Sequence, residues 1–588
     1  MSVLDAEFPP HVLREYALVA DGERGALIGP RGDISWMCAP AWDSPSVFSS
    51  LIGGPGCYAV TPLQRFVWGG YYEAGSLIWR SRWVAEDGIV ECREALAFPA
   101  EPGRVVLLRR VVPVDVDARV RVFLEPRAGF GQEPLRDLEC HDGVWSGRTG
   151  DLHLRWQGAP TARVSPGRTR RHLEMELTVP AGTHHDLVLE VSAGPLERDP
   201  VRADDAWSAT EAAWQRAVPR LDSCLDPGGA RHSYAVMRGL TSAGGGMVAA
   251  ATTSLPERAE EGRNYDYRYV WIRDQCYAGQ AASAAGDPRL VADAARFVGA
   301  RLLDHGPNLA PAYTVTGDAV PDQYQLGLPG YPGGFDRVGN WVNQQFQLDA
   351  FGEALLLLAA AARADILETE GWKAAEVGAA AIAERWQEPD AGIWEIDDRP
   401  WTHSRLTAAA GLRALASVSP PGRAASDWLA LADRIVADTA ASAVHRNGHW
   451  TRSPGDEGLD GALLLPPLRG AVPADDPRTV ATLRAYEQEL VRDGYAYRFR
   501  SGRGRLGDEE GSFNLCGFVM AMALDQQGRR TEALRWWERI QAACGPPVLY
   551  SEEYDVAEHQ MRGNLPQAFV HAVMLEASAR LAGEEAGG

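Results

Sequence analysis

The chain has 588 residues and a formal net charge of −21, from 79 acidic and 58 basic side chains. A chain of this length exceeds the usual size of one domain, so we expect two domains or one large domain with an appendage. The acidic balance disfavours nucleic acid and anionic membranes as partners and suits a neutral substrate.

The sequence contains no membrane or export signal. No apolar run approaches the roughly 20 residues that cross a bilayer, and residues 1–7 lack the basic and apolar regions of a signal peptide. The 8 cysteines are scattered without a Cys-x-x-Cys pair, and the 13 histidines form no His-Glu-x-x-His motif. We therefore expect a cytoplasmic protein with free thiols and no protein-built metal site.

The first part of the chain has the pattern of β-strands. Several short runs are β-branched or alternate between apolar and polar residues, and Gly, Pro and Asp turns separate them; they lie at 105–112, 118–124, 153–156, 173–179 and 186–191. Short strands at close spacing predict an antiparallel β-sandwich, which we place at 1–195.

The pattern becomes helical after residue 195. We assign 196–225 to a helical linker and 226–588 to a helical domain, with predicted helices at 231–242, 269–284, 289–304, 343–363, 372–386, 404–417, 426–441, 479–491, 512–526, 531–543 and 566–581. Long loops rich in aromatic and acidic residues join these helices without intervening strands. This arrangement favours a closed ring of helical hairpins over a four-helix bundle, with a site at one mouth of the ring.

Two glutamates in aromatic surroundings lie far apart in the helical part. Glu395 follows Trp394, and Glu552 precedes Glu553 in the run SEEYD. Hydrolysis of a glycosidic bond requires two carboxyl groups, one to protonate the leaving oxygen and one to act on water or on the sugar. An apolar wall beside Glu395 would favour the protonated form that a general acid needs, although an isolated loop glutamate is more often a solvated surface residue. Neighbours in an extended segment point to opposite sides, so at most one of Glu552 and Glu553 should face a substrate.

Residues 264–274 (NYDYRYVWIRD) concentrate aromatic, arginine and aspartate side chains at a predicted junction of loop and helix. Flat apolar faces beside forked hydrogen-bonding groups are what a sugar subsite needs. A salt-bridged helix start with core aromatics explains the run equally well when it is taken alone. The acidic run 508–510 is better explained as a first helical turn, favoured by the helix dipole, than as a catalytic group.

Taken in order, these runs resemble glycoside hydrolase family 15, which contains glucoamylases, glucodextranases and bacterial trehalases. The resembling segments are 264–274, GIWE at 392–395, EGSFNLC at 510–516, SEEYD at 551–555 and GNLPQAF at 563–569. Near the start, the runs at 15–19, 26–38 and 43–48 resemble the amino-terminal domain of the trehalase-like bacterial members. The resemblance spans nearly the whole chain.

The resemblance implies an amino-terminal β-sandwich (a supersandwich) docked on an (α/α)6 barrel of six helical hairpins. It also implies exo-acting hydrolysis of α-glucosides with inversion, which releases β-glucose from the non-reducing end. Glu395 matches the general acid and Glu552 the general base, and inversion calls for a separation of roughly 6.5–9.5 Å between their carboxyls.

Six further positions match substrate-binding residues of the family. Arg273 and Asp274 match the pair that grips the terminal glucose, and Tyr267 matches a pocket residue placed to stabilise an oxocarbenium-like transition state. The remaining matches are Trp271, Trp394 and Arg498. No cofactor and no metal are implied, the expected partner is a neutral oligosaccharide or disaccharide, and a homo-oligomer is compatible with the sequence.

Three departures from the family pattern bear on the substrate. Tyr265 stands where bacterial relatives usually carry Trp, Leu565 stands where Phe is usual, and 402–409 lacks a Trp that is common in relatives. Because 402–409 resembles the leaving-group side, we favour α-glucans or malto- and isomalto-oligosaccharides as substrates. The alternative is an α,α-trehalase, which the trehalase-like amino terminus favours. A glycoside phosphorylase or a non-catalytic glycan-binding protein is a weaker alternative, because both matching glutamates are present.

Overall fold

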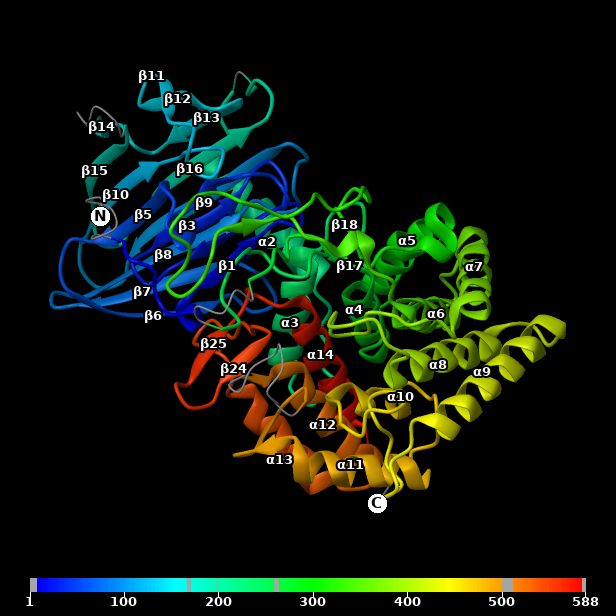
Figure 1. The fold of residues 1–588 in the computed structure, drawn as a ribbon. Coiled ribbons are helices and arrows are strands. Elements are labelled where there is room, and N and C mark those ends of the chain that lie inside the picture. Colours follow the sequence, from blue (N-terminus) through cyan, green and yellow to red (C-terminus); the bar gives the residue numbers. More distant parts are fainter. Residues whose placement is uncertain (1–7, 166–170, 198, 259–263, 500–510, 584–588) are drawn as a thin grey trace.

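The computed structural model describes residues 8–165, 171–197, 199–258, 264–499 and 511–583. Figure 1 shows a β-rich half, built from the amino-terminal third of the chain, against a helical half built from the rest. Among the described residues, no helix has the length and apolar character needed to span a bilayer.

The β-rich half is the predicted antiparallel sandwich. In the described residues each of its two sheets has eight strands. One has the order β1-β2-β3-β5-β10-β15-β14, with β4 paired to β3, and consists of β1 (Ala17–Ala20), β2 (Gly25–Ile28), β3 (Asp33–Cys38), β4 (Ser46–Phe48), β5 (Cys57–Pro62), β10 (Ala118–Glu125), β14 (Arg163–Val164) and β15 (Leu173–Val179). The other has the order β11-β12-β13-β16-β9-β8-β7-β6 and consists of β6 (Phe66–Tyr72), β7 (Trp79–Ala85), β8 (Ile89–Leu96), β9 (Arg104–Pro113), β11 (Leu135–His141), β12 (Val144–Thr149), β13 (Leu152–Gln157) and β16 (His185–Ser192).

The alternating pattern of the strands explains the sandwich. Along β10, Ala118, Val120 and Val122 are buried in the core between the sheets, whereas Arg119 between them is exposed. Side chains two apart share one face of a strand, so the apolar residues of both sheets meet in one core. The last strand of the sandwich ends at Ser192.

The helical half is a ring of hairpins, as predicted. Within the described residues, six inner helices pack side by side in the closed order α14-α4-α6-α8-α10-α12-α14, and six outer helices alternate with them along the chain. The inner helices are α4 (Ile272–Ala284), α6 (Leu348–Arg363), α8 (Thr402–Val418), α10 (Leu465–Leu468), α12 (Asn514–Gln526) and α14 (Ala568–Ala582). The outer helices are α3 (Pro227–Leu240), α5 (Pro288–His305), α7 (Thr369–Arg385), α9 (Arg423–Ser442), α11 (Pro477–Glu489) and α13 (Arg530–Gln541). This arrangement is an (α/α)6 barrel.

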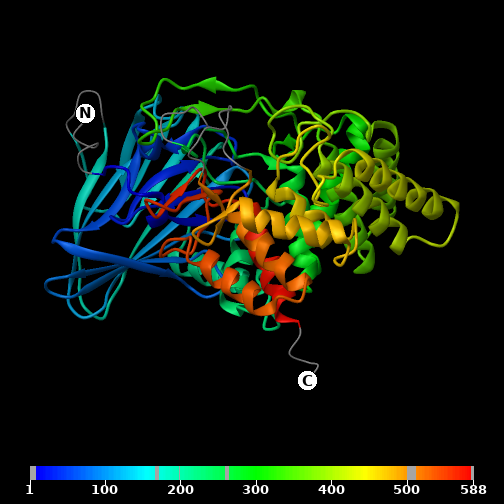
Figure 2. The same cartoon turned by 60° about the horizontal axis from the view of Figure 1, so that its bottom comes forward.

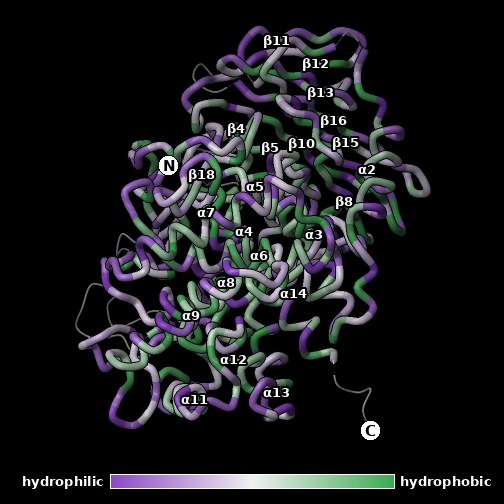
Figure 3. The backbone as a smooth tube through the Cα atoms, turned by 90° about the vertical axis from the view of Figure 1, so that its right-hand side faces the viewer, coloured by the Kyte–Doolittle hydropathy of each residue, from purple (hydrophilic) through white to green (hydrophobic). Residues whose placement is uncertain are grey.

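Inner and outer helices differ in composition because their surroundings differ. The inner helix α12 is buried from Asn514 through Leu524, since the barrel interior lies on one side of it and an outer helix on the other. The outer helices α11 and α13 carry hydrophilic stretches on the surface of the molecule (Figure 3). A helix covered on all sides has to be apolar all round, whereas a helix with one exposed face is amphipathic.

Two features of the helical half differ from the sequence-based expectations. The inner helix α10 was not predicted, because it is one turn long, continues a 3-10 turn at Gly461–Leu464 and contains Pro466 and Pro467. Proline is tolerated in a first helical turn, where its missing N–H has no partner to lose. The expectation of no intervening strands is also wrong, because short strands occur in the loops: β17 (Val270–Trp271), β18 (Ala312–Tyr313), β19 (Tyr324–Gln325), β20 (Arg337–Val338), β21 (Val491–Arg492), β22 (Tyr495–Ala496), β23 (Ser512–Phe513), β24 (Glu553–Asp555) and β25 (Gln560–Arg562).

The helix α2 (Ala203–Ala217), which lies within the predicted linker, packs against the sandwich. The ring of Trp214 in α2 stacks on Phe98, with centroids 4.2 Å apart. The limits drawn at residues 195 and 225 remain predictions.

The loops at the mouth of the barrel are held by the sandwich. The indole N–H of Trp36 in β3 donates to the Ala251 carbonyl at 2.8 Å. The loop that carries β19 and β20 reaches over the sandwich (Figure 2), where Gly330 N–H donates to the Ile52 carbonyl at 3.0 Å. Tyr331 donates to the His11 carbonyl at 2.7 Å. These hydrogen bonds to the sandwich therefore hold the loops at the mouth of the barrel in place.

Candidate active site

A cavity in the helical half brings together every site residue predicted from the sequence. Its lining includes the predicted residues Tyr267, Trp271, Arg273, Asp274, Trp394, Glu395, Arg498 and Glu552. These side chains come from the segment that leads into α4 and the first turn of α4, from the loop between α7 and α8, from the segment between β22 and β23, and from the residue before β24. Their convergence is a result of the ring closure, which places loops from distant hairpins side by side.

The charged residues of the run 264–274 lie in two different places. Arg268 and Asp266 are buried and form an ion pair of 2.7 Å, and Arg268 also donates to the Ser44 carbonyl of the sandwich at 2.9 Å. Arg273 and Asp274, by contrast, line the cavity at the start of α4. One ion pair of this run therefore anchors the domain contact, and the other lines the cavity.

The pair Arg273 and Asp274 offers fixed hydrogen-bonding groups to a ligand. The Arg273 guanidinium lies 3.1 Å from the Asp274 carboxylate and also donates to the Ile393 carbonyl at 2.8 Å. Burial raises the pKa of Asp274 to about 6, although the Arg273 charge opposes the shift. One carboxylate oxygen of Asp274, Oδ1, is buried with no hydrogen-bond partner in the described residues.

Glu395 is presented by a strained turn. Its φ is +54°, a left-handed conformation that is uncommon for a residue with a side chain, and Gly392 in the same turn has φ +67°. A Cβ on Gly392 would lie 2.7 Å from the Trp401 ring, so only glycine fits there. Glu395 Oε1 accepts the Trp271 indole N–H at 2.8 Å and lies 3.6 Å from Arg273. The carboxyl thus accepts a hydrogen bond from Trp271 and lies close to the positive charge of Arg273.

Trp394 is positioned next to Glu395 by a buried polar contact. Its indole N–H donates to Asp460 at 2.7 Å, and its ring meets the ring of Phe513 edge-on at 5.1 Å between centroids. Burial raises the pKa of Asp460 to about 6, although the hydrogen bond from Trp394 opposes the shift. The guanidinium of Arg498 lies over the Phe513 ring, 4.4 Å from its centroid.

Glu552 and Glu553 face different partners, as their adjacency predicted. Glu553 is fully buried and accepts a hydrogen bond of 2.9 Å from Arg498, whereas Glu552 lines the cavity. The phenol of Tyr267 donates to Glu552 Oε2 at 3.2 Å. Burial raises the pKa of Glu552 well above its usual range, the nearby Glu257 carboxylate raises it further, and the Arg498 charge opposes both.

Several cavity residues were not predicted from the sequence. They are Glu257, Gln323, Asn340 and Trp341, in loops that show no periodic pattern, and Gln345, which falls in the predicted helix 343–363 but follows a 3-10 turn ahead of α6 in the structure. Acidic or amide side chains in such loops resemble solvated surface residues until the fold places them, so no local signal could have found them.

The segment 402–409, which by resemblance lies on the leaving-group side, forms part of an inner helix. These residues are buried in the inner helix α8, and none of them lines the cavity. Trp341 does line it and is 63% exposed, so an aromatic face at the cavity comes from a different loop. The acidic run 508–510 lies outside the described residues.

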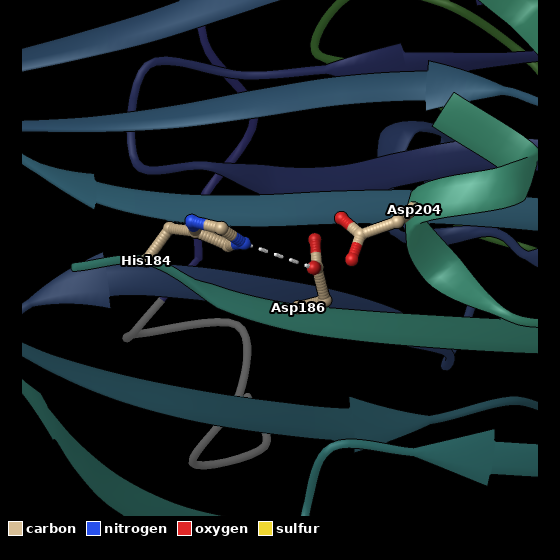
Figure 4. Close-up of side chains that lie close together, drawn as sticks. All are labelled: His184, Asp186 and Asp204. Atoms are coloured by element: carbon tan, nitrogen blue, oxygen red, sulfur yellow. Dashed lines mark ion pairs between the residues drawn. The ribbon is translucent and has the colours of Figure 1, made fainter. Parts of the chain in front are cut away.

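One group of potential metal ligands occurs in the described residues, where the sandwich meets α2 (Figure 4). It consists of His184, Asp186 and Asp204, with His184 3.6 Å from Asp186. Arg110 already pairs with both carboxylates, at 2.8 Å from Asp186 and 2.5 Å from Asp204. A guanidinium that neutralises both acids competes with a cation, so this group is an ion-pair network between β9, β16 and α2.

Comparison with known proteins identifies the family. Residues 232–579 match the family described as "Glycosyl hydrolases family 15", and residues 6–213 match the domain described as "Trehalase-like, N-terminal". The chain belongs to glycosyl hydrolases family 15, and it is a glycoside hydrolase.

Individual relatives cover nearly the whole chain. A protein named trehalase from Mycolicibacterium smegmatis is 31% identical, over 97% of this chain and 91% of the relative. A protein named trehalase from Mycobacterium tuberculosis is also 31% identical, over 98% of this chain and 90% of that protein. A crystal structure of a bacterial glucoamylase complexed with acarbose superposes with a TM-score of 0.71 at 13% identity, covering 97% of this chain and 94% of that one. This last similarity concerns the fold.

Proposed function

We propose that this chain is an α,α-trehalase that works by inversion. The observation that carries the proposal is the 31% identity, over 97% of the chain, to a protein named trehalase. That alignment includes the sandwich as well as the barrel, so it covers both the cavity and the domain that holds the cavity's loops. The alternative weighed from the sequence is therefore better supported than the α-glucan hydrolase that we favoured there.

The missing Trp in 402–409 does not count against trehalose as the substrate. The preference for α-glucans rested on the absence of a Trp from 402–409, but those residues are buried in α8 and none of them lines the cavity. We infer that Trp341 provides the aromatic face for the leaving sugar, since it lines the cavity and most of its surface is exposed. Sugar rings present apolar faces that pack against aromatic rings.

In this proposal Glu395 is the general acid. Its Oε1 is engaged by the Trp271 N–H, so the other oxygen holds the proton that passes to the oxygen between the two glucose units. Arg273, 3.6 Å away, then stabilises the carboxylate that remains. The fork of Arg273 and the unpartnered oxygen of Asp274 bind hydroxyl groups of the glucose that undergoes attack.

Glu552 is the general base in this proposal. It accepts a proton from the attacking water as the water oxygen bonds to the anomeric carbon from the face opposite the leaving sugar. In the same proposal Tyr267, which donates to Glu552, orients the carboxylate and stabilises the positive charge that develops in the transition state. In this proposal the cavity residues thus bind the sugar, protonate the oxygen of the leaving glucose and remove a proton from the attacking water.

The decisive experiment is proton NMR of the purified protein with trehalose, following the anomeric signals of newly released glucose. Both anomeric carbons of trehalose are α, so inversion releases equal amounts of β- and α-glucose, whereas retention releases only α-glucose at first. Maltose, isomaltose, maltotriose and kojibiose serve as competing substrates, with and without phosphate. The Glu552→Gln variant is the control for contaminating hydrolase.

Each result has a definite meaning. Equal β- and α-glucose from trehalose, with a much lower rate on the other sugars, supports the proposal. Hydrolysis of maltose or isomaltose but not of trehalose returns the assignment to the α-glucan hydrolase. Glucose phosphate formed only with added phosphate indicates a phosphorylase, and binding without turnover of any sugar indicates a glycan-binding protein.

A further inference from the structure

A second carboxyl group lies beside Glu552 in the cavity. Glu257 is only 3% exposed and lines the same cavity. The Tyr267 phenol lies 3.2 Å from Glu257 Oε1 and 3.2 Å from Glu552 Oε2, so one hydroxyl is placed between the two acids. Two buried carboxyls at such close range cannot both carry full charge without cost.

The backbone holds these two acids together. Gly563 N–H donates to the Pro256 carbonyl at 2.9 Å, and the side chains of Thr252 and Asn564 hydrogen-bond at 2.9 Å. A Cβ on Gly563, whose φ is +89°, would lie 3.5 Å from Glu257 Cγ and 3.6 Å from Glu552 Cβ. The segment that carries Glu257 is therefore tied to the hairpin that carries Glu552, and the approach of the two carboxyls is built into the fold.

The charged groups around Glu552 explain what this contact does. Within the described residues, the titratable and charged side chains that act on Glu552 include Glu257, Tyr267, Arg498 and Glu553. Arg498 favours the carboxylate form of Glu552 but also pairs with Glu553 at 2.9 Å. Burial, Glu257 and Glu553 all favour the protonated form. A base with a higher proton affinity removes a proton from water more readily, provided that it is still ionised at the working pH.

We propose that Glu257 is a positioning residue for the general base, which together with Tyr267 orients the Glu552 carboxylate and strengthens it as a proton acceptor. This inference rests on the proposed function, in which Glu552 is the base. The proton balance is simple: the water O–H bond breaks as the oxygen bonds to the anomeric carbon, and its proton moves to Glu552. Glu395 delivers a different proton to the leaving oxygen, and Glu552 returns its proton to solvent after product release.

The test compares the pH dependence of kcat/KM for wild type, Glu257→Gln and Glu257→Asp. Because Gln keeps the shape but removes the charge, we expect the acidic limb of Glu257→Gln to move to lower pH by about one unit or more, with a lower plateau rate. Glu257→Asp keeps the charge and should keep the wild-type limb. A lower rate in Glu257→Gln with an unmoved acidic limb would show a purely structural role and overturn the inference.

A second readout does not depend on turnover. In protein labelled with carboxyl-13C glutamate, the Glu552 resonance is the one missing from Glu552→Gln. We expect this resonance to titrate in two steps in wild type, because its proton is coupled to Glu257, and in one step at lower pH in Glu257→Gln. A single step in wild type would overturn the inference even if Glu257→Gln fails to fold. If the wild-type protein hydrolyses no sugar, the proposed function is refuted. The titration alone then decides whether Glu257 and Glu552 are coupled.

Discussion

Arg498 donates a hydrogen bond of 2.9 Å to Glu553, and this pairing distinguishes two glutamates that are adjacent in the sequence. Glu553 is fully buried against Arg498, while Glu552 lines the cavity. Arg498 therefore pairs with the buried Glu553 and also places a positive charge near Glu552, the proposed base. We therefore expect substitution of Glu552 to lower activity and substitution of Glu553 to lower stability.

We predict that Glu552→Gln lowers kcat by about 100- to 10,000-fold and leaves the melting temperature within a few degrees of wild type, because an amide cannot accept the water proton. Glu553→Gln is the contrasting variant. It removes the charge that compensates Arg498 and should lower stability by about 3–5 kcal/mol. Steady-state kinetics and thermal unfolding measure the two effects. Activity close to wild type in Glu552→Gln would assign the base to another carboxylate.

Glu395→Gln should show a dependence on the leaving group. A sugar leaving group needs a proton, so we expect a loss of about 100-fold or more on the natural substrate. Fluoride leaves with little protonation, so α-glucosyl fluoride should be hydrolysed at a rate within about tenfold of wild type. Glu552→Gln is the control, since it should lose activity on both substrates. An equal loss on both substrates in Glu395→Gln would refute the assignment of the acid.

Gly392→Ala tests the turn that presents Glu395. The new methyl group would meet the Trp401 ring at 2.7 Å, and the φ of +67° is unfavourable for alanine. We expect a loss of stability of roughly 1–3 kcal/mol and a marked loss of kcat as the turn shifts. Gly448→Ala is a matched control, because Gly448 has φ +89° but no atom within 4 Å of an added Cβ. The control should lose about 1 kcal/mol and retain its activity.

Acid stability should depend on Glu576 in the inner helix α14. Burial tends to raise the pKa of Glu576, but attraction to Arg469 and Arg580 outweighs this effect and lowers the pKa to about 2. A lowered pKa means that the group stabilises the fold above its unfolded pKa of about 4.3, and that this contribution disappears as the pH falls toward 2. Glu576→Gln should therefore be less stable than wild type at pH 7.

Denaturant unfolding at several pH values measures this contribution. The stability difference between wild type and Glu576→Gln should be constant above about pH 5 and become smaller at lower pH. A difference that is independent of pH down to about pH 3 would mean that the carboxylate charge is not what stabilises the fold.

The local pattern of the chain was enough to predict much of the architecture. Alternation along 118–124 predicted a strand that the structure contains, and amphipathic periodicity predicted most of the helices of the barrel. The helix α10 was not predicted. Its two prolines give it little helical propensity of its own, so it forms because the neighbouring helices of the ring pack against it. The short strands at the barrel mouth were missed for a similar reason, since each forms only where a second short segment pairs with it.

The sequence by itself determined which side chains are available for chemistry, because Trp394 and Glu395, and Glu552 and Glu553, are neighbours in recognisable local runs. Only the tertiary structure decided how those side chains divide their tasks. It placed Asp266 and Arg268 at the domain contact, Arg273 and Asp274 at the cavity, and Glu257 beside Glu552. The physical reason is that hydrogen bonds, burial and charge coupling act between atoms close in space, and closing a ring of helices brings distant loops together in a way that no local pattern specifies.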